Sequence, residues 1–140
     1  MDVLTYFKEM NANIICLQDT HWIEKDIPSI KRLWGNDCFI NGARSNARGV
    51  AILFKNNFEF EILAQIFDPE ANFICLTVKT TSAVFNIATL YGPDIDNPSF
   101  YSEIKKVTLE NNPEYYIICG DFNMTLDPDI DSFNYSQSTY

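Results

Sequence analysis

Hydrophobic positions follow helical spacing in some segments and strand spacing in others. Val3, Leu4, Phe7 and Met10 recur at intervals of mostly three residues, which predicts an amphipathic helix over residues 2–11. A second amphipathic helix is expected over 99–111, and a short helix, broken near Pro28, over 24–34. Short runs rich in branched and aromatic residues predict strands at 13–18, 37–41, 49–55, 58–66, 72–79, 83–91 and 115–119.

The order of these elements indicates the fold class. Helix–strand units at both ends, with a run of strands between them, predict a mixed α/β sheet covered by helices. The long run of strands also allows a second packed sheet. The chain has 140 residues, which is enough for one domain and too few for two. Residues 127–140 show no hydrophobic periodicity and are expected to be frayed.

Two of the apolar runs end in an acid. Residues 14–18 are followed by Asp19, and residues 117–120 by Asp121. Both runs are expected to be central strands covered on both faces, and ligands of helix-covered sheets bind beyond the carboxyl ends of the strands. Two carboxylates there repel unless a proton or a hard cation such as Mg²⁺ intervenes. The pair therefore indicates a metal or acid–base site, although each acid could simply mark where its strand meets water.

Further polar groups follow the same strands. Gly120-Asp121-Phe122-Asn123 combines a small residue that allows close backbone approach, a carboxylate and an amide that can donate to a phosphate oxygen, although such residues are also common in turns. Tyr91, in Leu90-Tyr91-Gly92-Pro93, ends another strand and could direct its phenol into the same cleft or bury it for packing. We expect Asp19, Tyr91, Asp121 and Asn123 to converge on one cleft.

Four ordered motifs resemble a known superfamily. They are Ile-Ile-Cys-Leu-Gln-Asp-Thr-His-Trp at 14–22, Arg-Gly-Val-Ala-Ile-Leu-Phe at 48–54, Tyr-Gly-Pro at 91–93 and Gly-Asp-Phe-Asn at 120–123. Together they resemble the endonuclease/exonuclease/phosphatase superfamily, and most of all the endonuclease domain of non-LTR (LINE-type) retrotransposons, over residues 2–126. The resemblance implies a DNase I-like four-layer α/β/β/α sandwich whose first and last strands are missing. Residues 1–140 are accordingly expected to form a single truncated domain.

The resemblance also implies a reaction, the Mg²⁺-dependent cleavage of a phosphodiester. By it, Asp19 binds the metal and Tyr91 lines the phosphate site. Asp121 and Asn123 orient the attacking water and bind the phosphate. The metal would neutralise charge on the phosphate and on the leaving oxygen while a carboxylate positions the nucleophile.

Three features depart from the superfamily pattern. Asp19 stands where the superfamily usually has Glu, which is one methylene longer. The strand that carries an Asn before the first helix has no counterpart, and neither does the closing Ser-Asp-His motif. The single histidine, His21, is expected to be a loop residue rather than the phosphate-contacting one. We therefore expect a DNA-nicking endonuclease that is inactive as this fragment.

The charge distribution leaves two other functions open. The chain carries 19 acidic and 10 basic residues, a net charge of −9, with no Lys or Arg after Lys106. Because nucleic-acid binding depends on Lys and Arg at phosphates, Arg44, Arg48 and Lys55 are the best available cluster for DNA, although the two arginines are more typical of a solvated turn. One alternative is a catalytically dead retrotransposon relic. The other is a phosphodiesterase or phosphatase acting on a small or lipid phosphate, which suits an arginine-poor surface better.

Cysteines and targeting signals suggest the compartment. Each of the four cysteines lies in an apolar run, which is typical of free buried thiols in a reducing compartment. No run reaches the length of a membrane-spanning helix, and the first residues do not resemble a signal peptide. We expect an intracellular protein without a membrane partner, nuclear if it acts on chromosomal DNA. The expected partners are DNA as the substrate and a reverse transcriptase domain in the parent polyprotein.

Overall fold

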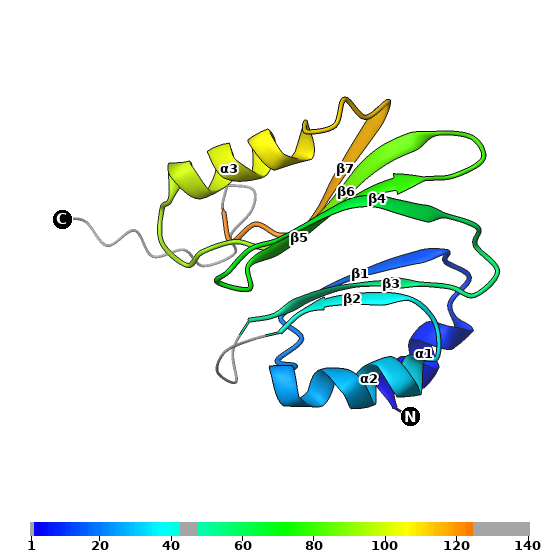
Figure 1. The fold of residues 1–140 in the computed structure, drawn as a ribbon. Helices are drawn as coiled ribbons and strands as arrows, with labels where there is room; N and C mark the ends of the chain where they lie inside the picture. Colours follow the sequence, from blue (N-terminus) through cyan, green and yellow to red (C-terminus); the bar gives the residue numbers. More distant parts are fainter. Residues whose placement is uncertain (1, 43–47, 125–140) are drawn as a thin grey trace.

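Two stacked sheets between helices make up the part of the chain that the computed structural model describes, residues 2–42 and 48–124. Helices α1 (Val3–Glu9) and α2 (Ile27–Trp34) cover the outer face of a three-stranded sheet. Helix α3 (Pro98–Thr108) covers the outer face of a four-stranded sheet (Figure 1). The order of layers is therefore α/β/β/α, and the expected four-layer sandwich is confirmed.

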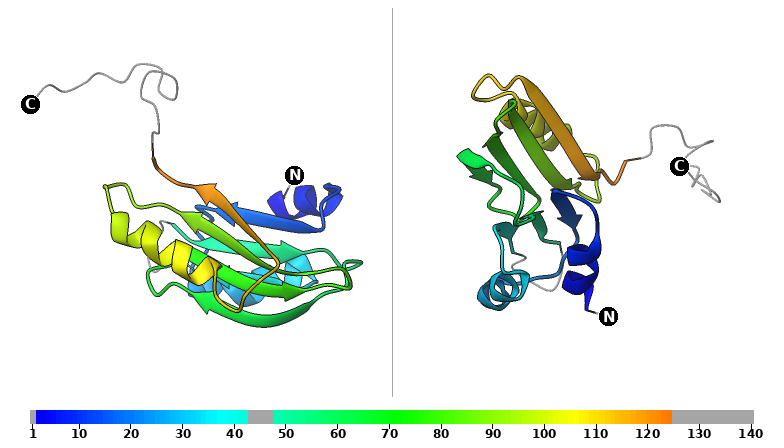
Figure 2. Two further views of the ribbon diagram at one scale, coloured as in Figure 1. Left: turned by 90° about the horizontal axis from the view of Figure 1, so that it is seen from above. Right: turned by 90° about the vertical axis from the view of Figure 1, so that its right-hand side faces the viewer.

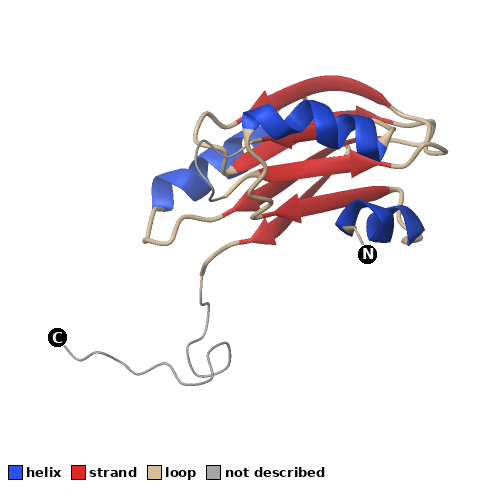
Figure 3. Cartoon of the chain, turned by 90° about the horizontal axis from the view of Figure 1, so that it is seen from below, coloured by secondary structure: helices blue, strands red, loops and turns tan. Residues whose placement is uncertain are grey.

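Sheet pairing is antiparallel with one exception. The smaller sheet has the order β1-β3-β2 and contains β1 (Ile14–Gln18), β2 (Cys38–Asn41) and β3 (Val50–Phe54). The larger sheet has the order β4-β5-β6-β7 and contains β4 (Glu61–Phe67), β5 (Phe73–Lys79), β6 (Val84–Tyr91) and β7 (Tyr115–Asp121). Strands β6 and β7 are parallel because α3 carries the chain back between them (Figure 1). Figure 3 shows the helices and strands from below. The sequence located all these strands and the three helices to within a few residues.

The second helix begins where the sequence analysis expected a break. A short 3₁₀ turn, η1 (Glu24–Asp26), leads into α2, and Pro28 lies in the first turn of that helix. A proline is tolerated there because the first N–H groups of a helix have no intrahelical partner. The break expected near Pro28 corresponds to the change from the 3₁₀ turn to α2 between Asp26 and Ile27, and Pro28 itself lies inside the helix. The helix ends instead at Gly35, whose φ of 77° suits glycine and whose N–H donates to the Lys31 carbonyl at 3.0 Å.

Strands β1 and β7 do not occupy the expected central positions. Each lies at the edge of its sheet, and the prediction that both are covered on two faces is wrong. Tyr115 and Tyr116 of β7 are 64% and 60% exposed, whereas every residue of β3 is buried. An apolar run predicts a strand that packs against a core, but it does not predict whether that strand lies at the centre or at the edge of its sheet.

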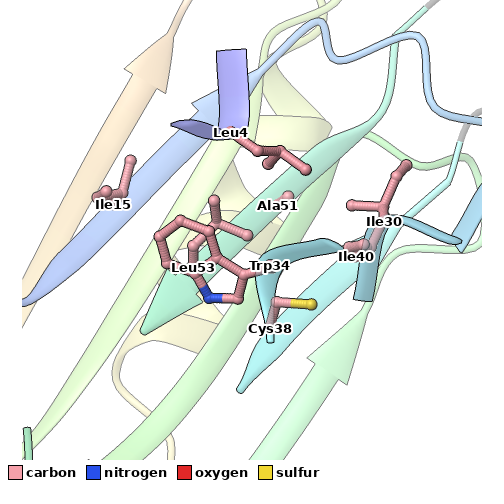
Figure 4. Close-up of a cluster of buried hydrophobic side chains, with 8 residues drawn as sticks. All are labelled: Leu4, Ile15, Ile30, Trp34, Cys38, Ile40, Ala51 and Leu53. Atoms are coloured by element: carbon pink, nitrogen blue, oxygen red, sulfur yellow. The ribbon is translucent and has the colours of Figure 1, made fainter. Parts of the chain in front are cut away.

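Three groups of buried side chains hold the layers together. The first lies between the two N-terminal helices and the smaller sheet, where the indole of Trp34 donates to the Phe54 carbonyl at 3.0 Å (Figure 4). The second fills the space between the sheets around Ile52, Phe54 and Leu76. The third lies under α3 and includes Ile104 and Val107. These layers fix the relative position of the two sheets and hence of the strand ends at their rim.

The two sheets bring distant parts of the sequence together at that rim. Strands β1 and β7 lie side by side although they belong to different sheets (Figure 2). The amide Nε2 of Gln18, at the end of β1, donates to the hydroxyl of Thr89 in β6 at 2.8 Å. The carboxyl ends of β1, β6 and β7 therefore meet at one edge of the molecule.

All four cysteines are free thiols, as expected. Cys38 and Cys75 are buried, but Cys16 and Cys119 are only half-buried because they lie on the two edge strands. None of the helices formed by residues 2–42 and 48–124 is long and apolar enough to cross a membrane.

Candidate functional site

Asp121 and Asn123 form a tight turn at the end of β7. The Oδ1 atom of Asp121 accepts a hydrogen bond of 2.9 Å from the backbone N–H of Asn123, whose φ is 48°. The Asn123 amide Nδ2 donates to the Gly92 carbonyl at 2.6 Å and lies 3.4 Å from Oδ1 of Asp94. The carboxylate and the amide are thus held at fixed positions on the rim.

Tyr91 lies next to Asp121 in the neighbouring strand. The two residues are register partners at the carboxyl ends of the parallel strands β6 and β7. The Tyr91 ring is half-buried against the core between the sheets, and its N–H donates to the Asn72 carbonyl at 2.7 Å. The structure therefore places the Tyr91 backbone beside Asp121, while the ring contributes to packing.

A helix residue fixes the chain just beyond β7. The Tyr101 hydroxyl of α3 donates to the Phe122 carbonyl. Burial of the ring raises the pKa of Tyr101, and the neighbouring charges of Asp121 and Asp96 add to this rise. The phenol therefore stays protonated at neutral pH and remains a hydrogen-bond donor.

Asp19 is held in a second turn, at the end of β1. Its Oδ1 atom lies 2.8 Å from Nε2 of His21 and accepts a bond of 3.3 Å from the Arg48 N–H. The backbone N–H of His21 donates to the Arg48 carbonyl at 2.9 Å. The side chains of Asp19 and His21 are about half exposed, at 46% and 53%. His21 is a loop residue, as expected, and it contacts the acid that precedes it.

An open depression of about 700 Å³ lies between these turns. Among the described residues, Asp121 and Asn123 line it, whereas Asp19 and Tyr91 do not. The expected convergence of all four side chains on one cleft thus holds for two of them. Gln18 and Asp94 also line the depression, and the sequence analysis did not single them out. The alternation of β1 could have pointed to Gln18, because residues 14, 16 and 18 share one face of that strand. For Asp94 the only sequence signal is its position directly after Tyr-Gly-Pro.

The basic cluster expected from the sequence is divided by a strand. Strand β3 runs between Arg48 and Lys55, so roughly 20 Å of extended chain separates these two residues. Lys55 donates through Nζ to the carbonyls of Lys8 and Met10 at the end of α1, and Arg48 donates to Asn72 at 3.2 Å. Arg44 lies outside the described residues. Arg48 and Lys55 therefore do not form one patch, and a cluster that includes Arg44 stays a prediction.

The polar groups at the rim suit a hard cation. They are the carboxylates of Asp94 and Asp121 and the amides of Gln18 and Asn123, and Mg²⁺ prefers such oxygen donors. Asp19 keeps Oδ2 without a hydrogen-bond partner among the described residues. Within residues 2–42 and 48–124, no three His, Cys, Asp or Glu side chains gather around one point. Because Mg²⁺ is usually held by one or two carboxylates and keeps several waters, the residues present fit a largely hydrated ion.

Comparison with protein families decides the ancestry. The model of the endonuclease/exonuclease/phosphatase family matches residues 2–137. The chain belongs to this family. A curated relative, the "Transposon TX1 uncharacterized 149 kDa protein" of Xenopus laevis, is 26% identical over 129 residues, which cover 89% of this chain and 10% of that protein.

Solved structures show the same fold for this family member. The 2',3'-cyclic phosphatase ANGEL2 matches with a TM-score of 0.60 and 21% identity over 89% of this chain and 43% of that one. An AP endonuclease from Archaeoglobus fulgidus matches with a TM-score of 0.61 and 19% identity over 91% and 53%. D. rerio TDP2 complexed with a single-strand DNA product gives 0.61 and 16% over 91% and 54%. The chain thus spans about half of these structures and a tenth of the transposon protein.

Proposed function

We propose that this chain is the core of a Mg²⁺-dependent phosphodiester hydrolase that nicks DNA, of the type found in LINE retrotransposons. The observation that carries the proposal is the turn Asp121–Asn123, which holds a carboxylate and an amide at fixed positions in an open depression. The transposon relative and the family match support it. In this proposal residues 1–140 belong to a single domain of a longer polyprotein that also contains a reverse transcriptase, and the enzyme acts on DNA in the nucleus.

Each rim residue has a role that follows from its contacts. Asp121 uses Oδ1 to hold the Asn123 backbone, which leaves Oδ2 free to accept a hydrogen bond from the attacking water and so to orient it. The Asn123 amide donates a short hydrogen bond to the Gly92 carbonyl, at 2.6 Å, and a long one to Asp94, at 3.4 Å. Its second amide hydrogen could therefore donate to a phosphate oxygen instead of to Asp94. The family resemblance assigns Tyr91 to the phosphate site, but its ring packs in the core, so in this proposal it would support that site by holding the backbone beside Asp121. Asp19 would hold the Mg²⁺, which supplies charge neutralisation on the phosphate and the leaving oxygen.

The histidine count limits the activity expected of these 140 residues. The chain has one histidine, and its ring lies 2.8 Å from Asp19. No further imidazole is available to donate to the scissile phosphate. Because loss of one preorganised donor costs roughly 10²–10³ in rate, we expect nicking by this chain alone to be near background.

A plasmid-nicking assay with added imidazole tests the proposal. Free imidazole can supply the donor that the chain lacks, so we expect Mg²⁺ and imidazole together to raise nicking of supercoiled DNA above the level with Mg²⁺ alone. The Asp121→Ala variant should lose this increase because it lacks the carboxylate that orients water. The Asp37→Ala variant is the matched control, since Asp37 is an exposed acid that bonds to Phe54 only through its backbone carbonyl.

Two outcomes would contradict the proposal. Equal nicking by the wild-type chain and Asp121→Ala would show that the Asp121 carboxylate plays no part. The absence of any imidazole-dependent increase would favour a catalytically dead relic.

One observation favours a second candidate, a phosphodiesterase or phosphatase acting on a small or lipid phosphate. Among the described residues that line the depression none is basic, and the chain carries a net charge of −9. A polyanion such as DNA gains little affinity from such a surface, whereas a small phosphate has less charge to repel. Faster hydrolysis of bis(p-nitrophenyl) phosphate than of plasmid at equal phosphodiester concentration, lost in Asp121→Ala, would support this candidate.

A further inference from the structure

Two thiols from different sheets face the same interior space. Cys16 lies two residues before Gln18, so both side chains project from the same face of β1. Gln18 reaches across to Thr89 of β6, and Thr89 is the register partner of Cys119 in β7. Neighbouring residues in register share a face of their sheet. The topology therefore directs Cys16 and Cys119 toward each other between β1 and β7.

The two side chains are neighbours where β1 contacts β7. Sγ of Cys119 lies 3.5 Å from the carbonyl of Ala88, the residue before Thr89 in β6. The nearby Cys16 thiol lowers the pKa of Cys119, and the Thr89 hydroxyl adds to this, although burial acts in the opposite direction. The Cys119 thiol raises the pKa of Cys16, and burial adds to this rise. A thiol with a lowered pKa beside a second thiol is an arrangement from which disulfide exchange can proceed.

The other two cysteines differ from this pair in their location and in their burial. Cys38 packs in the cluster under α1 and α2, and Cys75 packs in the cluster under α3. Both are buried, and burial raises the pKa of each thiol. Cys16 and Cys119 are half-buried at the edges of their sheets. Cys16 and Cys119 are therefore the pair more open to a dissolved disulfide.

We propose that Cys16 and Cys119 form a redox-active dithiol that glutathione disulfide oxidises to an intramolecular disulfide. One protein thiolate attacks a sulfur of glutathione disulfide and releases one glutathione thiolate. The second protein thiol, as its thiolate, attacks the resulting mixed disulfide and releases the other glutathione. Two protein thiols become one S–S bond, their two electrons and two protons pass to two glutathione molecules, and no other reactant is needed.

Formation of the disulfide uses two neighbouring edge strands. The two sulfurs would come to about 2.05 Å through rotation of half-buried side chains on strands that already contact each other. The bond would join the edge strand of one sheet to that of the other, just before Asp19 and Asp121 in the chain. Closing a loop of about 100 residues in the unfolded chain should raise Tm by roughly 5 °C or more. This inference does not depend on the proposed hydrolase activity.

Oxidation of the purified 140-residue chain in graded mixtures of reduced and oxidised glutathione tests the proposal. After oxidation the chain is denatured, alkylated with N-ethylmaleimide and mapped by peptide mass spectrometry. We expect the wild-type chain to lose two hydrogens, to join the peptides of Cys16 and Cys119, and to retain maleimide on Cys38 and Cys75. The oxidised chain should also show the higher Tm.

Two variants make the result specific. Cys16→Ser should abolish both the linked peptide and the rise in Tm, whereas Cys38→Ser should preserve both because Cys38 lies in another cluster. Any of three results would overturn the proposal: maleimide on all four cysteines at every glutathione ratio, glutathione adducts without an internal link, or a disulfide between chains or between another pair.

Discussion

Backbone strain at the residue scale gathers around the candidate site. Asp19, His21, Arg48 and Asn123 have positive φ values of 52°, 57°, 66° and 48°. Such conformations cost about 1–3 kcal/mol where the side chain is neither Asn, Asp nor Gly. Each is stabilised locally, because the turns at Asp19 and Asn123 are closed by the hydrogen bonds that position their polar groups. By that measure His21 and Arg48 carry the strain at the site, and both lie in the turn that holds Asp19.

Gly120, directly before Asp121, is a position where no side chain fits. Its φ is +146°, and a Cβ atom would lie 2.9 Å from the backbone N and C of Leu90 and still closer to the Leu90 carbonyl oxygen. We expect Gly120→Ala to lower the free energy of unfolding by about 2 kcal/mol or more, because a backbone clash adds to the strain. Urea denaturation followed by circular dichroism measures this loss.

Gly35→Ala is the matched control for that change. Gly35 also has a positive φ, of +77°, but a Cβ atom added there would meet nothing within 4 Å. Alanine there should cost only about 1 kcal/mol, the usual cost of a left-handed conformation. Equal losses for the two variants would show that close packing of β7 against β6 is not what requires Gly120.

At the scale of elements, a single buried amide anchors α3 to the larger sheet. Asn86 of β6 is 1% exposed and donates from Nδ2 to the carbonyls of Thr108 and Glu110, at 2.7 and 2.8 Å. Its Oδ1 accepts from the Thr77 hydroxyl at 2.7 Å. The amide therefore satisfies carbonyls at the end of α3 that have no partner within the helix. This contact fixes the crossover that sets β7 parallel to β6.

Removal of that amide should loosen the crossover. We expect Asn86→Ala to lower the free energy of unfolding by about 2–4 kcal/mol, because it leaves the Thr108 and Glu110 carbonyls and the Thr77 hydroxyl without their partner. Hydrogen exchange should quicken in α3 and β7 more than in β3. Asn57→Ala, at an exposed asparagine, should change stability by less than about 0.5 kcal/mol. A loss in Asn86→Ala no larger than in Asn57→Ala would show that the anchor contributes little.

The sequence predicts the positions of helices and strands along the chain better than it predicts the order of the strands within each sheet. Hydrophobic periodicity found α1, α3 and the strands because it depends on local spacing. It placed β1 and β7 at the centre of a sheet, although both are edge strands, because strand order depends on contacts between distant residues. Pro28 marks the start of α2 rather than an interruption within a helix, and the local sequence around a proline does not distinguish these two positions.

The site was predictable only in part, for the same reason. Asp121 and Asn123 adjoin in sequence, and the turn that joins them is local. Gln18 and Asp94 reach the depression through the packing of one sheet on the other, which no sequence spacing reveals. Asp19 turns toward His21 and Arg48 because the residues entering β3 pair with the turn after β1.

At the scale of the whole molecule, an exposed apolar strand edge favours self-association and a large negative net charge opposes it. In the part of the chain that the structure describes, the outer side of β7 has no strand partner. Four consecutive side chains of this strand are exposed: Tyr115, Tyr116, Ile117 and Ile118. An unpaired edge with exposed apolar side chains is prone to pair with another chain, while the net charge of −9 opposes association. Salt should shift this balance toward association because it screens charge and leaves burial unchanged.

We therefore expect the isolated chain to self-associate through β7, increasingly so at higher salt. Tyr116→Lys should reduce the associated fraction because a lysine on an edge strand disfavours pairing with another strand. Leu33→Lys is the matched control, since Leu33 is 56% exposed on α2 and the substitution changes the net charge by the same amount. Size-exclusion chromatography with light scattering, over a range of concentration and salt, measures the associated fraction. An equal reduction in both variants would assign association to charge alone, and a monomer at every concentration and salt would show that this edge does not drive association.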